Sequence, residues 1–161
     1  MATRYSFSPL AAEFPATGLA TLGLSNRRPV LAFDASIDQT VYWTAVAPQG
    51  LATPLTCHIY FAMASATSGA VVFQAAIEAI TPGDAVDTDS TTSFDSNNNS
   101  SAITVPGTAG YVGIVSITLT NNDGIQPGDY FRLRVNRDAD NGSDTAAGDC
   151  YVFLVELRDN A

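Results

Sequence analysis

Short runs of alternating apolar and polar residues recur along most of the chain, and no stretch keeps the 3.6-residue spacing of an amphipathic helix. The runs are rich in Val, Ile, Phe, Tyr and Thr, and clusters of Gly, Pro, Asn, Asp and Ser separate them. This pattern is typical of β-strands joined by turns. It predicts strands at residues 30–34, 40–47, 55–64, 70–80, 111–120, 130–137 and 150–157.

The strands and their connections together predict an all-β fold. Some connections are tight and others are long, which favours a Greek-key arrangement over a simple meander. We therefore expect residues 29–161 to form an antiparallel jelly-roll-like sandwich of about eight strands. In the last strand, simple alternation places one set of side chains together on one face, namely Tyr151, Phe153, Val155 and Leu157.

Residues 1–28 differ from the rest because their apolar residues follow neither the helical nor the strand period. Pro9, Pro15, Gly18 and Gly23 interrupt any helix of useful length. The segment is predicted to be an extended N-terminal arm that contributes little to folding of the sandwich. It either packs along its own domain or becomes ordered on a neighbouring subunit, and the residues expected to make that contact are Tyr5, Phe7, Leu10, Phe14, Leu19, Leu22 and Leu24.

Composition and charge restrict the possible partners. The 161 residues suit one domain, and 46% of them are apolar, as in an ordinary globular protein. The chain has seven Arg, no Lys and sixteen acidic residues, giving a net charge of −9, so a nucleic-acid partner is not expected. No run approaches the roughly 20 apolar residues of a membrane span, and Glu13 and the prolines interrupt every candidate signal peptide.

No constellation of catalytic or metal-binding residues stands out, so we expect neither an enzyme nor a cofactor. The only histidine, His58, lies within a predicted strand, and Cys57 and Cys150 are expected to be buried thiols. Two acidic groups are candidates for calcium binding: one is Asp84, Asp87 and Asp89, and the other is a partial calcium-loop pattern at Asp138, Asp140, Asp144 and Asp149. Helices flank neither group, and no metal site is predicted. A sugar-binding platform of exposed aromatic residues is conceivable at Tyr42, Tyr60, Tyr111 and Tyr130.

Four segments of the sequence resemble small virion proteins of tailed bacteriophages. They are RPVLAFD at 28–34, TVYWTAVAP at 40–48, GDYFRLRVNRD at 128–138 and DTAAGDCYVFLVELR at 144–158. The family comprises jelly-roll proteins that decorate phage heads as cement proteins or form receptor-facing modules of tails and fibres. The resemblance implies a homotrimer on the outer capsid surface, assembled in the host cytoplasm and bound to the major capsid protein.

The resulting hypothesis is a structural virion protein that stabilises the shell. Apolar residues on both faces of some strands support self-association, because a lone sandwich should keep one face polar. The residues expected in a trimer contact are Tyr42, Val46 and Tyr60. The alternative is a phage tail or fibre module, or a host-glycan-binding β-sandwich.

Overall fold

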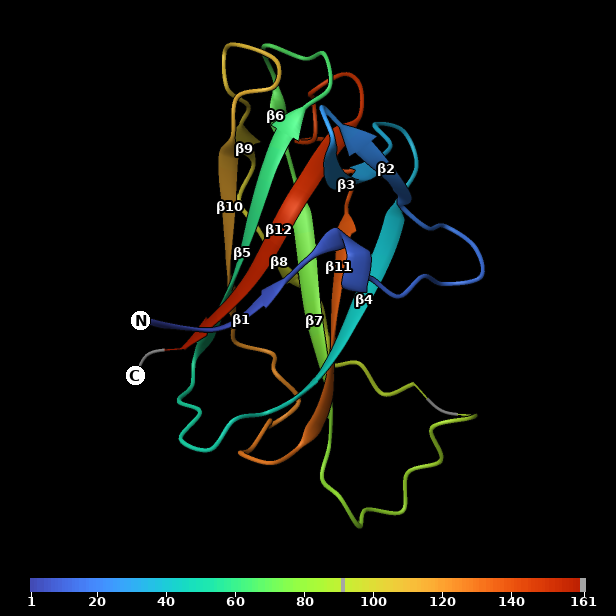
Figure 1. Ribbon diagram of the computed structural model, residues 1–161, viewed down its shortest axis with the longest axis vertical. Coiled ribbons are helices and arrows are strands. Elements are labelled where there is room, and N and C mark those ends of the chain that lie inside the picture. Colours follow the sequence, from blue (N-terminus) through green and yellow to red (C-terminus); the bar gives the residue numbers. More distant parts are fainter. Residues whose placement is uncertain (91, 160–161) are drawn as a thin grey trace.

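The computed structural model describes residues 1–90 and 92–159, and its long elements are all β-strands (Figure 1). No helix in this part of the chain is long and apolar enough to cross a membrane. The elements are β1 (Ala2–Phe7), the 3₁₀ turn η1 (Pro9–Ala11), β2 (Thr21–Ser25), β3 (Arg28–Phe33), β4 (Gln39–Val46), β5 (Leu55–Met63), β6 (Ala70–Val71), β7 (Phe73–Ile80), β8 (Asn98–Asn99), β9 (Ile103–Thr104), β10 (Gly113–Leu119), β11 (Tyr130–Arg137) and β12 (Cys150–Asp159). Six of the seven strands predicted from the sequence are present as single strands, and the seventh, at 70–80, is divided at Val72 into β6, which pairs with β9, and β7, which joins the smaller of the two main sheets.

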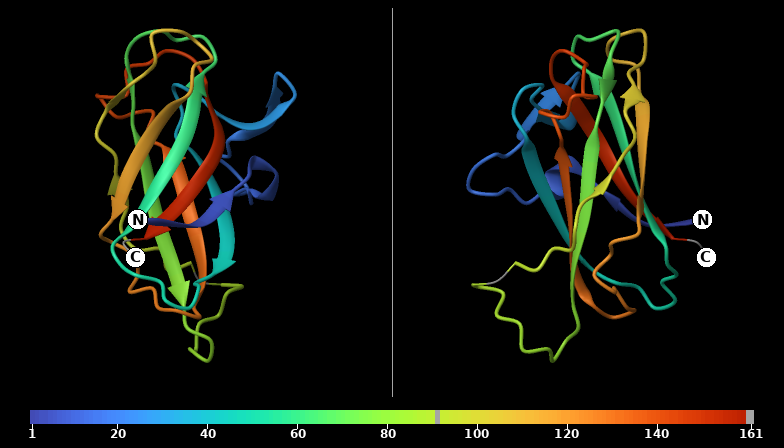
Figure 2. Two further views of the ribbon diagram at one scale, coloured as in Figure 1. Left: turned by 60° about the vertical axis from the view of Figure 1, so that its left-hand side comes forward. Right: turned by 180° about the vertical axis from the view of Figure 1, so that it is seen from behind.

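Two antiparallel sheets face each other (Figure 2). One has the order β10-β5-β12-β3-β2, with β1 also paired to β12, and the other has the order β4-β11-β7-β8. Within them, β3-β12-β5-β10 opposite β4-β11-β7-β8 is the strand order of an eight-stranded jelly roll, in which most connections cross from one sheet to the other. The predicted antiparallel jelly-roll sandwich is therefore confirmed, with β1 and β2 added to its larger sheet.

The core lies between the inner faces of the two sheets. Alternate residues of each long strand point into it, and the largest apolar side chains there are Trp43, Phe33, Phe61, Phe73 and Phe131. Burial of such a side chain stabilises the fold by roughly 1.5–3 kcal/mol. Cys57 and Cys150 are buried free thiols in this core, as expected.

Of the two alternatives left open for the N-terminal arm, packing along its own domain holds for Ala2–Phe7, which form a strand of the larger sheet. β1 pairs with β12 from Ala2 opposite Asp159 to Phe7 opposite Val155. Phe7 is only 8% exposed and stacks on Trp43 at 5.8 Å between ring centroids, and the Trp43 indole donates a hydrogen bond to the Ser8 carbonyl at 3.0 Å. β1 is held in the sheet by backbone pairing with β12, and of its side chains only Tyr5 and Phe7 pack with the core. The segment therefore needs no regular alternation of apolar and polar residues.

The remainder of the arm is also tied to the sandwich. β2 forms a hairpin with β3, and Glu13 and Leu19 form single bridges to Tyr42 and Thr40 of β4. Its large apolar side chains nevertheless stay accessible to solvent. Those that remain exposed are Leu10, Phe14, Leu19, Leu22 and Leu24.

Candidate functional site

A groove of about 640 Å³ lies on the outer face of the larger sheet. Tyr151 and Phe153 of β12 contribute aromatic side chains to it, and the buried Ala62 of β5 also lines it. The β2–β3 turn supplies Ser25, Asn26 and Arg28, while Met63, Ala64, Gly110 and Val112 complete the lining. The groove therefore combines an apolar, aromatic surface with a few polar groups along one side.

A bulge in β12 produces the aromatic wall. The pairing of β12 with β5 shifts register between Val152 and Leu154, so Phe153 lacks a residue opposite it in β5. An extra residue of this kind reorients the side chains of the bulged strand. The alternation predicted from the sequence is wrong here, since Tyr151 and Phe153 line the outer groove while Val155 and Leu157 lie in the core.

Two turns set the rim of the groove. Asn26 and Arg27 both have positive φ, at 45° and 66°, which is the conformation of a two-residue type I′ hairpin turn. On the opposite side, the Gly110 amide donates a hydrogen bond to the Met63 carbonyl at 3.0 Å, and Gly110 has a φ of 81° that few other residues adopt. Both rims are thus fixed to the sheet by local backbone geometry.

A polar network continues along the same face from the groove. The Tyr60 hydroxyl donates to a Glu156 carboxylate oxygen at 3.0 Å, and Arg158 donates to the Tyr60 oxygen at 2.9 Å and also bonds Glu156. The hydrogen bond from Arg158 lowers the pKa of Glu156, and burial raises the pKa of Tyr60. These side chains hold each other in place beside the groove.

Ser116, His58 and Glu156 lie on neighbouring strands of this face, but their geometry does not suit nucleophilic catalysis. The Ser116 hydroxyl lies 2.9 Å from His58 Nδ1, and within the described residues the buried Nε2 atom has no hydrogen-bond partner. A catalytic triad needs an acid on the second ring nitrogen, whereas Glu156 is engaged by Tyr60 and Arg158. Burial also lowers the pKa of His58, which favours the neutral form of the ring.

The outer face of the smaller sheet carries a stacked column of arginine and aromatic side chains. The Arg132 guanidinium lies 4.6 Å from the Tyr42 ring centroid and 5.7 Å from that of Phe94, and Arg134 lies 4.8 Å from Phe94. Arg132 also approaches Glu78 at 3.8 Å. Because these rings and cations pack on one another, the column stabilises this face.

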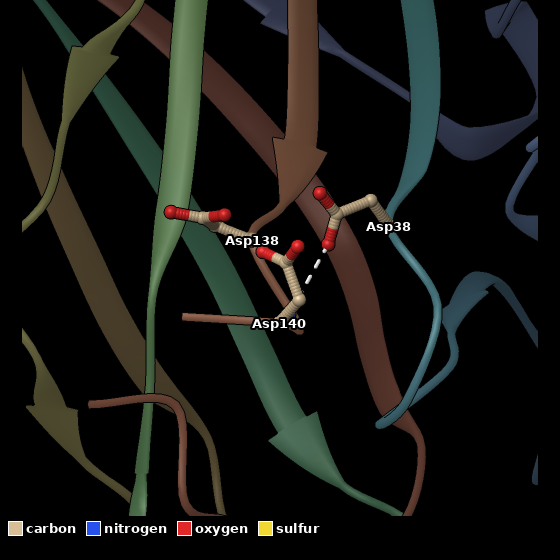
Figure 3. Close-up of side chains that lie close together, drawn as sticks. All are labelled: Asp38, Asp138 and Asp140. Atoms are coloured by element: carbon tan, nitrogen blue, oxygen red, sulfur yellow. Dashed lines mark hydrogen bonds between the residues drawn. The ribbon is translucent and has the colours of Figure 1, made fainter. Parts of the chain in front are cut away.

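The calcium-loop pattern is not assembled as the sequence suggested. Asp144 instead forms an ion pair with the fully buried Arg137, at 2.7 Å from its Nη2. Asp38 from the β3–β4 loop lies close to Asp138 and Asp140 (Figure 3). One carboxylate oxygen of each residue lies within 4.8 Å of the other two. Asp38 accepts hydrogen bonds from the amides of residues 139 and 140, and its charge raises the pKa of Asp140. Such oxygens can offer ligands to a hard cation.

The residues predicted for subunit contacts are dispersed. Tyr42 and Val46 lie on the outer face of the smaller sheet, while Tyr60 lies on the outer face of the larger one. Of the arm residues, Phe7 and Tyr5 pack with the core and the other five stay exposed. The homotrimer and its contact with a capsid remain predictions.

The groove residues were not singled out from the sequence. Its aromatic wall depends on the bulge at Phe153, which has no compositional signature, and simple alternation places Tyr151 and Phe153 on the same face as Val155 and Leu157. Of the four tyrosines considered as a sugar platform, Tyr111 lies next to the groove residue Val112 and is exposed, and Tyr60 belongs to the adjoining network. Tyr42 and Tyr130 lie on the opposite sheet.

No family model matches the sequence, and no curated protein matches it. A solved structure of the carbohydrate-binding module TmCBM61 in complex with β-1,4-galactotriose aligns with 92% of this chain and 87% of that chain, at 9% identity and a TM-score of 0.45. A likeness this distant gives no information about a ligand of this chain.

Proposed function

We propose that the chain is a non-catalytic binding module that holds an oligosaccharide in the groove between the β2–β3 turn and β12. The observation that carries the proposal is the pair of aromatic side chains, Tyr151 and Phe153, in an open groove rimmed by Arg28 and Asn26. The C–H face of a sugar ring packs against an aromatic ring, and hydroxyl groups pair with guanidinium and amide groups.

The size and chemistry of the groove support this ligand class. Binding sites for small ligands usually occupy roughly 300–1,000 Å³ and combine an apolar lining with a few polar groups that fix orientation. Arg28 is exposed, and in the described part of the chain no carboxylate pairs with it. Its donors are therefore available to sugar hydroxyls or to the carboxylate of an acidic sugar.

Binding is tested with a glycan array, followed by affinity electrophoresis in gels that contain the best-binding polysaccharide. We expect Tyr151→Ala and Phe153→Ala to weaken binding by at least about tenfold, or about 1.4 kcal/mol. Tyr130→Ala, which removes a partly exposed tyrosine of the other sheet, serves as the matched control and should bind like the unmodified chain. Equal loss in all three variants, or no binding to any glycan, would contradict the proposal.

A second candidate function is attachment to a virion, as the phage resemblance implies. The observation that favours it is the exposure of Leu10 within η1, at 69%, and of Phe14 in the segment that follows η1. A cement protein would bury such side chains against the major capsid protein. Cryo-electron microscopy of virions purified from cells that make the chain distinguishes the cases. Hundreds of copies on the shell support cement, a few copies on a tail support a fibre module, and absence from the particle rejects both.

A further inference from the structure

β2 forms one of the two edges of the larger sheet, and β10 forms the other. Within the described residues β2 is the last strand of that sheet and pairs only with β3. Figure 2 shows the β2–β3 hairpin standing away from the body of the sandwich. Its leucines are accessible, with Leu22 at 45% and Leu24 at 74% exposure.

This edge lacks the features that usually prevent strands from pairing between molecules. Edge strands are normally protected by charged residues, prolines or bulges. β2 reads TLGLS, its pairing with β3 is regular from Thr21 to Ser25, and no charged residue occurs anywhere in residues 14–26. The backbone of this strand is therefore open to a further strand.

The register of the hairpin determines which groups face the edge. The turn at Asn26 and Arg27 has two residues, so Ser25 and Arg28 form the hydrogen-bonded pair next to it. Pairs alternate along an antiparallel ladder. The backbone amides and carbonyls of Leu22 and Leu24 therefore point away from β3, toward the free edge.

We propose that β2 pairs antiparallel with β2 of a second copy of this chain, about a two-fold axis through Gly23. In this register Leu22 of each copy lies opposite Leu24 of the other, so the residues with free backbone groups bond each other. All four leucines then meet on one side of the joined sheet. The edge is thus complementary to itself, as a two-fold interface requires.

The distribution of charge favours this edge over the other surfaces of the chain as the place where two copies meet. The chain carries a net charge of −9, so two copies repel each other over most orientations. Contact through the uncharged segment 14–26 keeps the acidic residues of both copies away from the interface. Arg27 and Arg28, which follow the segment, lie at opposite ends of the paired strands in the two copies.

The pairing has a consequence for the groove. A two-fold axis perpendicular to a joined sheet keeps the same face of both halves on one side, so both grooves open in the same direction. Ser25 and Arg28 of each copy place the two grooves beside the shared edge. This step rests on the proposed function: if each groove binds an oligosaccharide, the dimer binds a polysaccharide of repeating units with higher avidity than the monomer.

The association is tested without any glycan, by sedimentation equilibrium of the full chain from 1 to about 200 µM. We expect a concentration-dependent species of twice the 16.8 kDa chain mass. Leu24→Lys should raise the dimer dissociation constant at least tenfold, whereas Leu10→Lys, a control of similar exposure outside the edge, should leave it unchanged. A monomer throughout, a trimer, or equal effects of the two variants would overturn the proposal.

A cross-link tests the register independently of affinity. Non-hydrogen-bonded residues opposite each other in antiparallel strands have Cα atoms about 4.5 Å apart, within the range for a disulfide. A side chain added at Gly23 meets no atom within 4 Å, and burial raises the pKa of Cys57 to about 12, so the native thiols stay inert. Gly23→Cys should form a covalent dimer on mild oxidation, and Gly142→Cys, at another position with open space, should not. The absence of a covalent Gly23→Cys dimer would reject the register.

Discussion

At the scale of single residues, the most consequential side chain outside the groove is Arg137. It is fully buried, and it donates to Asp144 and to the carbonyls of Gly148 and Ala146 at 3.0 and 2.9 Å. It therefore closes the loop between β11 and β12. The same interaction explains why the partial calcium pattern fails, since a carboxylate paired with a buried guanidinium is not available to a cation.

We expect Arg137→Met to lower the free energy of unfolding by about 3–5 kcal/mol, because it leaves the Asp144 carboxylate buried without its partner. Urea denaturation followed by tryptophan fluorescence measures the change. The double variant with Asp144→Asn should recover part of the loss, because the remaining side chain is neutral. A single variant as stable as the unmodified chain would show that the pair contributes no net stability.

Asp140 provides a pH-dependent prediction at the same scale. The neighbouring charge of Asp38 raises its pKa, so the folded state holds this proton more tightly than the unfolded state does. Its contribution to stability is therefore fully present below the pKa of the unfolded state. It is lost as the pH rises from that value through the higher pKa of the folded state. Asp38→Asn keeps an oxygen for the two backbone amides and removes the charge.

NMR titration of the side-chain carboxyl carbons measures this effect. We expect the pKa of Asp140 to fall toward its usual value in Asp38→Asn and to stay unchanged in Asp84→Asn, which alters an exposed aspartate of another loop. An unchanged Asp140 in the first variant would show that Asp38 is not the cause.

At the scale of elements, β1 is the clearest addition to what the sequence predicts. Because Phe7 packs on Trp43 inside the sandwich, we expect Phe7→Ala to lower the free energy of unfolding by about 3–5 kcal/mol. Leu10→Ala, at an exposed position, should change it by less than about 0.5 kcal/mol. Urea denaturation compares the two, and equal small effects would restore the extended-arm interpretation.

The long strands were predictable because each alternates clearly and is bounded by turn residues, as in Leu55–Met63 and Tyr130–Arg137. β1 and β2 were missed because an edge strand needs few buried side chains. The groove was missed for two further reasons. Its rim comes from turns distant in sequence, and its aromatic wall depends on an inserted residue that shifts the period of β12 by one.

At the scale of the whole molecule, one core joins both sheets, and the acidic cluster lies in loops at its margin. We expect removal of divalent cations with EDTA to change the Tm by less than about 2 °C, because a ligand stabilises the fold only in proportion to its binding to the native state. Differential scanning calorimetry with and without added Ca²⁺ is the measurement. A loss of more than about 10 °C would make Asp38, Asp138 and Asp140 a structural metal site.

The claim that a carbohydrate occupies the groove is tested most directly by amide chemical-shift mapping with the best-binding oligosaccharide from the array. We predict the largest shifts at Ser25–Arg28, Gly110–Val112 and Tyr151–Phe153, which surround the groove, with little change on the opposite sheet around Tyr42 and Arg132. Shifts concentrated on that opposite sheet, or no shifts at millimolar oligosaccharide, would contradict the account.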